Sequence, residues 1–156
     1  MKAETKIQGI ESGRAKFAWD CAKKGKEIST KKTKIGEELY EDKNYKSYVK
    51  RLPELIKTNG LGAALAFVFS KRQKDPKKPK NAYDLIYKQI GEWLSKEDNK
   101  HLWSGCNSNN ELIEKIISCN SSSYRALTIE VLAFLNWLRR FAEGLIEEGD
   151  DTIIAQ

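Results

Sequence analysis

The sequence predicts an all-α protein that folds as a single compact bundle of about five to six helices. Apolar residues recur at intervals of three and four over several long segments, which is the period of an amphipathic helix. The alternation of apolar and polar residues that marks a strand never extends beyond four residues. With 156 residues, 40% of them hydrophobic, the chain has the size and composition of one globular domain. We therefore expect one helical domain over residues 1–156.

The first predicted helix covers about residues 5–24. Its positions at helical spacing include Ile7, Ile10, Arg14, Phe17, Ala18 and Cys21, with Arg14 at the edge of the apolar face. The pattern then stops at residues 25–42, which contain two glycines and several Ser and Thr residues. Six lysines lie between positions 23 and 34, against a single Glu27. We expect this segment to be a mobile basic loop, with one helical turn at residues 37–40.

Residues 44–70 predict two helices joined by a tight turn. The apolar positions are Tyr45, Tyr48, Val49, Leu52, Leu55 and Ile56, then Leu61, Ala64, Leu65, Val68 and Phe69. Pro53 lies inside the first stripe, and because the apolar phase continues on both sides we expect a kinked helix rather than two elements. Asn59 and Gly60 tolerate the left-handed backbone that ends a helix.

The second half of the chain predicts a basic loop and three further helices. The loop covers about residues 71–81 and carries six Lys and Arg residues. Helices follow at 82–94, where Asn81 is the expected cap, at about 112–117, where residues 108–111 form an expected capping box, and at 124–147. Residues 148–156 contain two aspartates and are expected to form a frayed acidic end.

The residues needed for catalysis or metal binding do not converge in this sequence. His101 is the only histidine, and no catalytic or phosphate-loop motif occurs. Cys21, Cys106 and Cys119 are odd in number and far apart, so we expect neither a disulfide framework nor a zinc site. Gly60 and Gly62 are interpreted as a helix–helix turn rather than a phosphate cradle. We therefore expect no enzyme activity, no metal and no cofactor.

The charge of the chain points to an anionic partner such as nucleic acid. The formal net charge is +6 and the pI is about 9.1. Cations on one predicted helix face are Lys43, Lys46, Lys50 and Lys57, with Arg51 beside them. A plain solvated face explains such a stripe equally well. A helix-turn-helix regulator is disfavoured, because the helix that would read the groove is mostly apolar from Tyr124 through Phe141.

The amino terminus lacks the apolar core of a signal peptide, and no apolar run approaches the roughly 20 residues of a membrane span. We therefore expect no membrane partner and a cytoplasmic location.

Two stretches carry a specific resemblance. These are YKSYVKRLPELIKTNGLGAALAF at 45–67 and WLRRFAEGLIE at 137–147. Both are similar to the small helical subunit of the type III-B CRISPR RNA-silencing complex, the Cmr complex. The combination of a proline inside a helix with a following NGLG is uncommon, and the resemblance extends over nearly the whole chain.

The resemblance implies a non-catalytic helical subunit that stacks in more than one copy along an antiviral ribonucleoprotein. It implies that backbone subunits hold the guide RNA and cut, and that a large polymerase-like subunit docks at one end of the row. The small subunit would support the guide and target RNA through their backbones. Carried over, the RNA-facing candidates are Lys46, Lys50, Arg51, Arg139 and Arg140, with Arg14 as a further candidate. The alternative is a stand-alone helical nucleic-acid-binding or adaptor protein.

Overall fold

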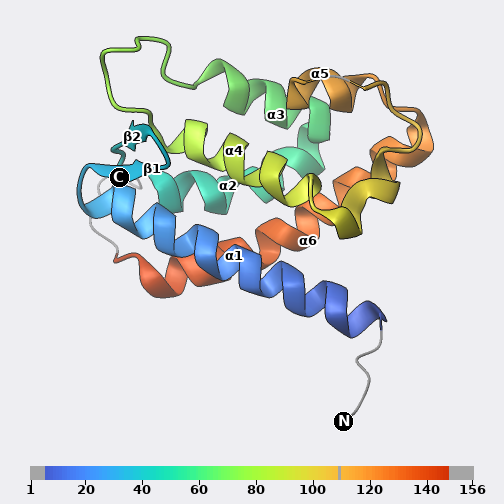
Figure 1. Cartoon of the computed structure of the whole chain (residues 1–156), viewed down its shortest axis with the longest axis horizontal. Coiled ribbons are helices and arrows are strands. Elements are labelled where there is room, and N and C mark those ends of the chain that lie inside the picture. The colour runs from blue at the N-terminus through green and yellow to red at the C-terminus, as the bar shows by residue number, and fades with distance from the viewer. Residues whose placement is uncertain (1–5, 109, 148–156) are drawn as a thin grey trace.

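The computed structural model describes residues 6–108 and 110–147, and over these residues it confirms the predicted all-α class (Figure 1). Six α-helices, one 3-10 helix and one small hairpin make up this part of the chain. The elements are α1 (Lys6–Thr30), β1 (Thr33–Ile35), β2 (Glu38–Tyr40), α2 (Tyr45–Asn59), α3 (Leu61–Ser70), α4 (Ala82–Leu94), the 3-10 helix η1 (Glu97–Trp103), α5 (Leu112–Ile117) and α6 (Ser121–Leu145).

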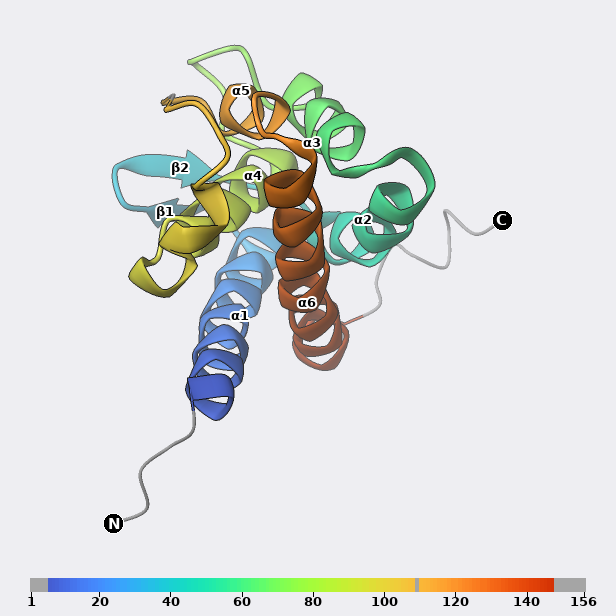
Figure 2. The same ribbon diagram turned by 90° about the vertical axis from the view of Figure 1, so that its right-hand side faces the viewer.

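The two longest helices, α1 and α6, pack together along most of their length (Figure 2). The two helices run in the same direction. Phe17 of α1 contacts Phe134 of α6, and further along both helices Trp19 contacts Phe141. The Trp93 ring of α4 stacks on Phe17 and Phe134, with ring centroids 5.5 and 6.0 Å away. This aromatic cluster joins α1, α4 and α6, and the other helices complete the core around it.

The first helix is longer than predicted. It continues through Gly25 to Thr30, and residues 33–40 form an antiparallel hairpin, so the predicted mobile loop at 25–42 is wrong. Gly25 is buried in the helix, where an added Cβ would lie 2.0 Å from Cε1 of Tyr45. Glycine is therefore present for close packing, which sequence reasoning mistook for a break.

The two basic segments meet on one side of the molecule (Figure 1). The backbone N–H of Lys80 donates to the carbonyl of Leu39 at 2.7 Å, and the N–H of Glu41 donates to the carbonyl of Lys80 at 2.9 Å. Lys80 also pairs with Glu38 at 3.6 Å. The loop at 71–81 is thus held against the hairpin.

The predicted ends of α2 and α4 are confirmed, whereas α6 begins at Ser121 instead of residue 124. Helix α2 is continuous through Pro53 and ends at Gly60, whose φ is 91°. Asn81 caps α4, and the Asn120 side chain caps α6 by accepting from Ser123 at 2.9 Å. The capping box expected at 108–111 is wrong, because α5 begins at Leu112 and its N-cap residue is Glu111, whose carboxylate accepts from the Tyr87 hydroxyl.

The cysteines also differ from expectation. Cys106 and Cys119 form a disulfide that ties the segment after η1 to the turn before α6. Cys21 is buried, and this burial raises the pKa of its thiol to about 12. The sequence did not reveal the pairing, since the two bonded cysteines lie thirteen positions apart and the folded connection between them brings them together.

The expected acidic end at 148–156 lies outside the described residues. Within the described residues, no helix combines the length and apolar character needed to cross a membrane.

Candidate nucleic-acid interface

Helix α2 presents one apolar face to the core and a basic face to solvent. Val49, Leu52 and Ile56 are buried, as their spacing predicts. Four of the predicted cations are exposed on or just before the helix: Lys43, Lys50, Arg51 and Lys57. We call these four residues the α2 cations. Glu54 is the only exposed acid on the helix between them.

The α2 cations keep their charges available. Over residues 6–108 and 110–147, no ion pair joins any of the four to another side chain. Lysine and arginine ends that stay solvated can approach phosphate oxygens without first breaking an internal pair. The helix therefore offers a charged surface that can follow a phosphate backbone without reading its bases.

Lys46 lies on the same stripe but is not part of this surface, contrary to the prediction. Its side chain is only 4% exposed, and its Nζ donates to the carbonyl oxygen of Ile146 at 3.2 Å. Ile146 ends α6, where carbonyl groups have no partner within the helix and attract a positive charge. Lys46 therefore caps α6, and its role is structural.

Arg14 is likewise engaged inside the fold. Its Nε and Nη2 donate to the two carboxylate oxygens of Glu130 at 2.7 and 2.8 Å, which is a bidentate ion pair. The Glu130 carboxylate also accepts from the indole N–H of Trp93 at 3.1 Å. The hydrogen bond to Glu130 raises the pKa of Arg14. The expectation that Arg14 faces RNA is therefore replaced by a role in joining α1, α4 and α6.

Of the two arginines predicted on α6 to face RNA, one is exposed and the other is partly buried. Arg140 is exposed, while Arg139 is half-buried and lies 3.8 Å from Glu143, one turn further along. Because α2 and α6 pack together, Arg140 and the α2 cations belong to neighbouring helices (Figure 2).

The basic loop at 71–81 carries exposed lysines at 74, 77 and 78. This loop borders Glu37 and Glu38 of the hairpin, so acids share its surface. Arg72 is occupied, because its guanidinium stacks over the rings of Phe69 and Tyr87 at 4.0 and 4.8 Å. The α2 cations therefore lie on a surface with fewer acidic neighbours than the loop at 71–81.

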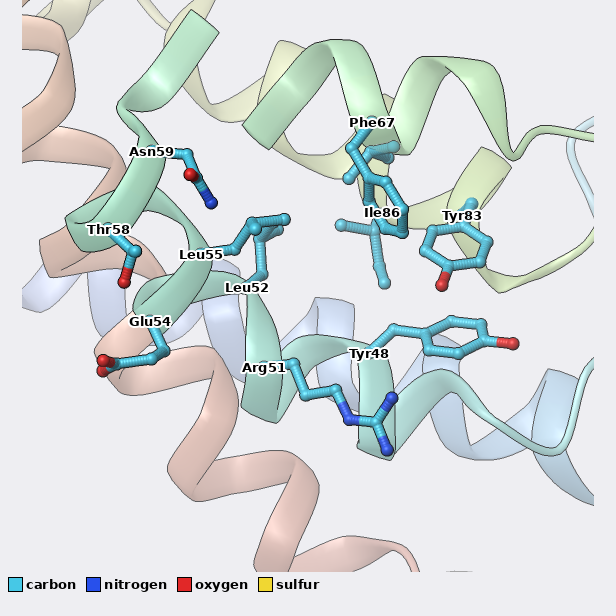
Figure 3. Close-up of a pocket in the computed structure, with 11 residues that line it drawn as sticks. Tyr48, Arg51, Leu52, Glu54, Leu55, Thr58, Asn59, Phe67, Tyr83 and Ile86 are labelled. Carbon is cyan, nitrogen blue, oxygen red and sulfur yellow. The ribbon is translucent and has the colours of Figure 1, made fainter. Parts of the chain in front are cut away.

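An apolar groove of about 410 Å³ lies beside the α2 cations, between α2, α3 and α4 (Figure 3). Its walls are Leu52 and Leu55 on one side and a ring cluster on the other, with Arg51 at the rim. In that cluster Tyr48 stacks on Tyr83 at 4.0 Å, and Phe67, which is 42% exposed, meets Tyr83 edge-on. Burial raises the pKa of Tyr83 to about 12. Sequence reasoning assigned these apolar positions to the core and missed the groove.

The described residues contain no cluster of three or more His, Cys, Asp or Glu side chains able to hold a metal ion. His101 lies exposed on η1.

Comparisons with known proteins agree with this architecture. The family model described as CRISPR-associated protein (Cas_Cmr5) matches residues 10–145. The CRISPR system Cmr subunit Cmr5 of Thermus thermophilus is 33% identical over 104 residues, which cover 67% of this chain and 76% of the relative. The crystal structure of a CRISPR-associated Cmr5 family protein, also from Thermus thermophilus, has a TM-score of 0.56 and 25% identity, covering 93% of this chain and all of that one. The chain belongs to the Cmr5 family and is a small subunit of the type III-B Cmr complex.

Proposed function

We propose that this Cmr subunit is non-catalytic and supports the guide and target RNA of the complex through backbone contacts. The observation that carries the proposal is the exposed set of α2 cations, which have no internal partner in the described chain. Exposed cations spaced along one helix neutralise phosphates irrespective of base sequence. Arg140, which is exposed on the neighbouring helix α6, is a further candidate for a phosphate contact.

The proposed subunit works in an array. Its RNA surface is small and its contacts are individually modest, so one copy binds weakly and several copies on one strand bind tightly. Its partners in the proposal are the backbone subunits, the large polymerase-like subunit and further copies of itself, assembled in the cytoplasm. The competing function, a stand-alone nucleic-acid binder or adaptor, requires tight binding by the isolated chain.

The test is a salt titration of single-stranded and duplex RNA binding, comparing the wild-type chain with the triple variant Lys50→Ala/Arg51→Ala/Lys57→Ala. Losing three phosphate contacts lowers the magnitude of the slope of log K against log salt by about 2–3, at roughly 0.7–0.9 per contact. The matched control is Lys74→Ala/Lys77→Ala/Lys78→Ala, which removes the same charge from the exposed loop and leaves the slope nearly unchanged.

An unchanged slope in the α2 variant removes the α2 cations from RNA binding. Tight binding of one sequence by the isolated chain supports the stand-alone function instead. Cleavage of the RNA that persists after repeated purification contradicts a non-catalytic role.

A further inference from the structure

The apolar groove between α2, α3 and α4 has an aromatic wall, formed by Tyr48, Phe67 and Tyr83. Tyr48 and Tyr83 stack with their ring centroids 4.0 Å apart, and Phe67 meets Tyr83 edge-on at 5.9 Å (Figure 3). Phe67 is 42% exposed, so its ring is open to a ligand. The groove volume of about 410 Å³ lies in the range of about 300–1,000 Å³ that is typical of small-molecule sites. Such a hollow favours a flat ligand that stacks on the rings.

Two cations lie next to this aromatic wall. Arg51 lines the groove from α2. The Nζ of Lys71, which follows α3, lies 5.6 Å from the centroid of the Phe67 ring. Both side chains are exposed, and over residues 6–108 and 110–147 no ion pair joins either of them to another side chain. The groove therefore combines an apolar interior with a positively charged edge, which suits a ligand that is aromatic at one end and anionic at the other.

The rim of the groove on α2 is polar. Glu54, Thr58 and Asn59 are exposed there, and their side chains make no hydrogen bond within the described part of the chain (Figure 3). These groups can bond to the edge of a planar ring that carries amino and carbonyl groups. Glu54 is the one acid among the described residues that line the groove. Because its carboxylate accepts from an amino group and repels a phosphate, an anionic group stays outside the hollow, beside the cations.

We propose that the groove binds one unpaired nucleobase of the RNA strand whose phosphates contact the α2 cations. The inference rests on the proposed function, since the strand has to follow α2 for its base to reach the groove. The base stacks on the aromatic wall, its polar edge faces the α2 rim, and its phosphate contacts Arg51. Stacking uses the π-face that every base has, so the site accepts any sequence. A base paired in a duplex is excluded, because it stays within its helix.

The position of Arg51 connects the groove with the other α2 cations. At about 100° per residue, Arg51 lies about 40° around α2 from Leu55, which forms part of the groove wall. Lys50 and Lys57 lie about 100–120° from Arg51 on the other side, facing solvent. A phosphate bound to Arg51 is thus next to the groove, and the neighbouring phosphates of the strand continue toward Lys50 and Lys57. An apolar protein side chain would fill the same hollow, but it supplies no negative charge for Arg51 and Lys71.

The experiment maps two short RNA probes on the isotope-labelled full chain by amide chemical shifts. One probe is tetra-adenylate, and the other is its fully abasic counterpart, which keeps the ribose phosphates and has no bases. We expect both probes to shift the amide signals of Lys50 and Arg51. We expect tetra-adenylate alone to shift the groove signals, which are the amides of Leu55, Phe67 and Tyr83, because only this probe brings a base to the groove.

Variants at Phe67 separate stacking from plain apolar contact. Phe67→Ala and Phe67→Leu both remove the ring, so each should weaken binding of tetra-adenylate at least about fivefold and leave binding of the abasic probe unchanged. Phe67→Tyr keeps a ring and should retain the wild-type affinity. The matched control is Ile129→Ala, which removes an exposed apolar side chain from α6 and should leave both affinities unchanged. Equal affinity of the wild type and Phe67→Ala for tetra-adenylate overturns the base contact.

The pattern of shifts separates this inference from the proposed function. If both probes shift Lys50 and Arg51 but neither shifts the groove signals, the groove takes no base and the proposed phosphate contacts remain. If neither probe shifts Lys50 or Arg51, the proposed function fails, and the base site fails with it. Groove signals that shift when the chain is concentrated without RNA, and do not shift with tetra-adenylate, assign the groove to a second copy and overturn the proposal.

Discussion

Lys46 and Lys50 lie one turn apart on α2 and look alike in the sequence, yet the fold uses them in opposite ways. Lys46 is 4% exposed and caps the carbonyl end of α6, whereas Lys50 is solvated with its charge available. The difference arises because α6 ends beside the first turn of α2. Helical spacing thus identifies a shared face, but the neighbouring helix decides which cations on that face stay exposed.

Arg14 and Arg51 differ in the same way: one is paired inside the fold and the other is exposed. The Arg14 guanidinium is paired in bidentate fashion with Glu130 and bridges α1 and α6, whereas Arg51 stands at the rim of an open groove. The basic residues therefore divide into internal cations that hold helices together and exposed cations that are available to phosphates.

The largest expected effect is a loss of folding stability when an internal cation, Arg14, is removed. Arg14→Ala leaves the mostly buried Glu130 carboxylate without its cation, and we expect the free energy of unfolding to fall by about 2–3 kcal/mol. Urea unfolding at pH 7 measures the loss. The double variant Arg14→Ala/Glu130→Ala should recover part of it, since no unpaired charge then remains. Equal losses in Arg51→Ala would erase the distinction between the two arginines.

An intermediate effect is expected from alkaline pH. Burial raises the pKa of the Cys21 thiol from 9.0 to about 12, so the folded chain holds a proton that the unfolded chain has released. The stability that this thiol contributes is fully present below pH 9 and is lost as the pH rises toward 12, about 2 kcal/mol by pH 10.5. Urea unfolding of Cys21→Ala should show a weaker decline above pH 9 than the wild type. Identical pH profiles would mean that burial does not hold the thiol neutral.

Much of the fold could be predicted from the sequence, because most helices carry their own apolar stripe. The spacing from Tyr45 to Ile56 and the Asn59–Gly60 ending correctly placed α2. The cap at Asn81 was an equally local signal. These features depend on residues a few positions apart, which is why a single sequence reveals them.

The remaining features depend on contacts between distant segments. Gly25 signals a break in isolation, and only the Tyr45 ring packed against it explains a glycine inside a helix. The Cys106–Cys119 bond and the Lys46 cap of α6 require elements brought together by folding. The candidate site was predicted in part for the same reason: the sequence identified its cations, and tertiary packing removed Arg14 and Lys46 from the surface.

The most direct measurement compares Lys46→Ala with Lys50→Ala, two variants that each remove one charge from the same helix one turn apart. We expect Lys46→Ala to lower the free energy of unfolding by about 1–2 kcal/mol and to leave the salt slope of RNA binding unchanged. We expect Lys50→Ala to change stability by less than about 0.5 kcal/mol and to lower the slope by roughly 0.7–0.9. Indistinguishable stability and indistinguishable slopes in the two variants would contradict the division into internal and exposed cations.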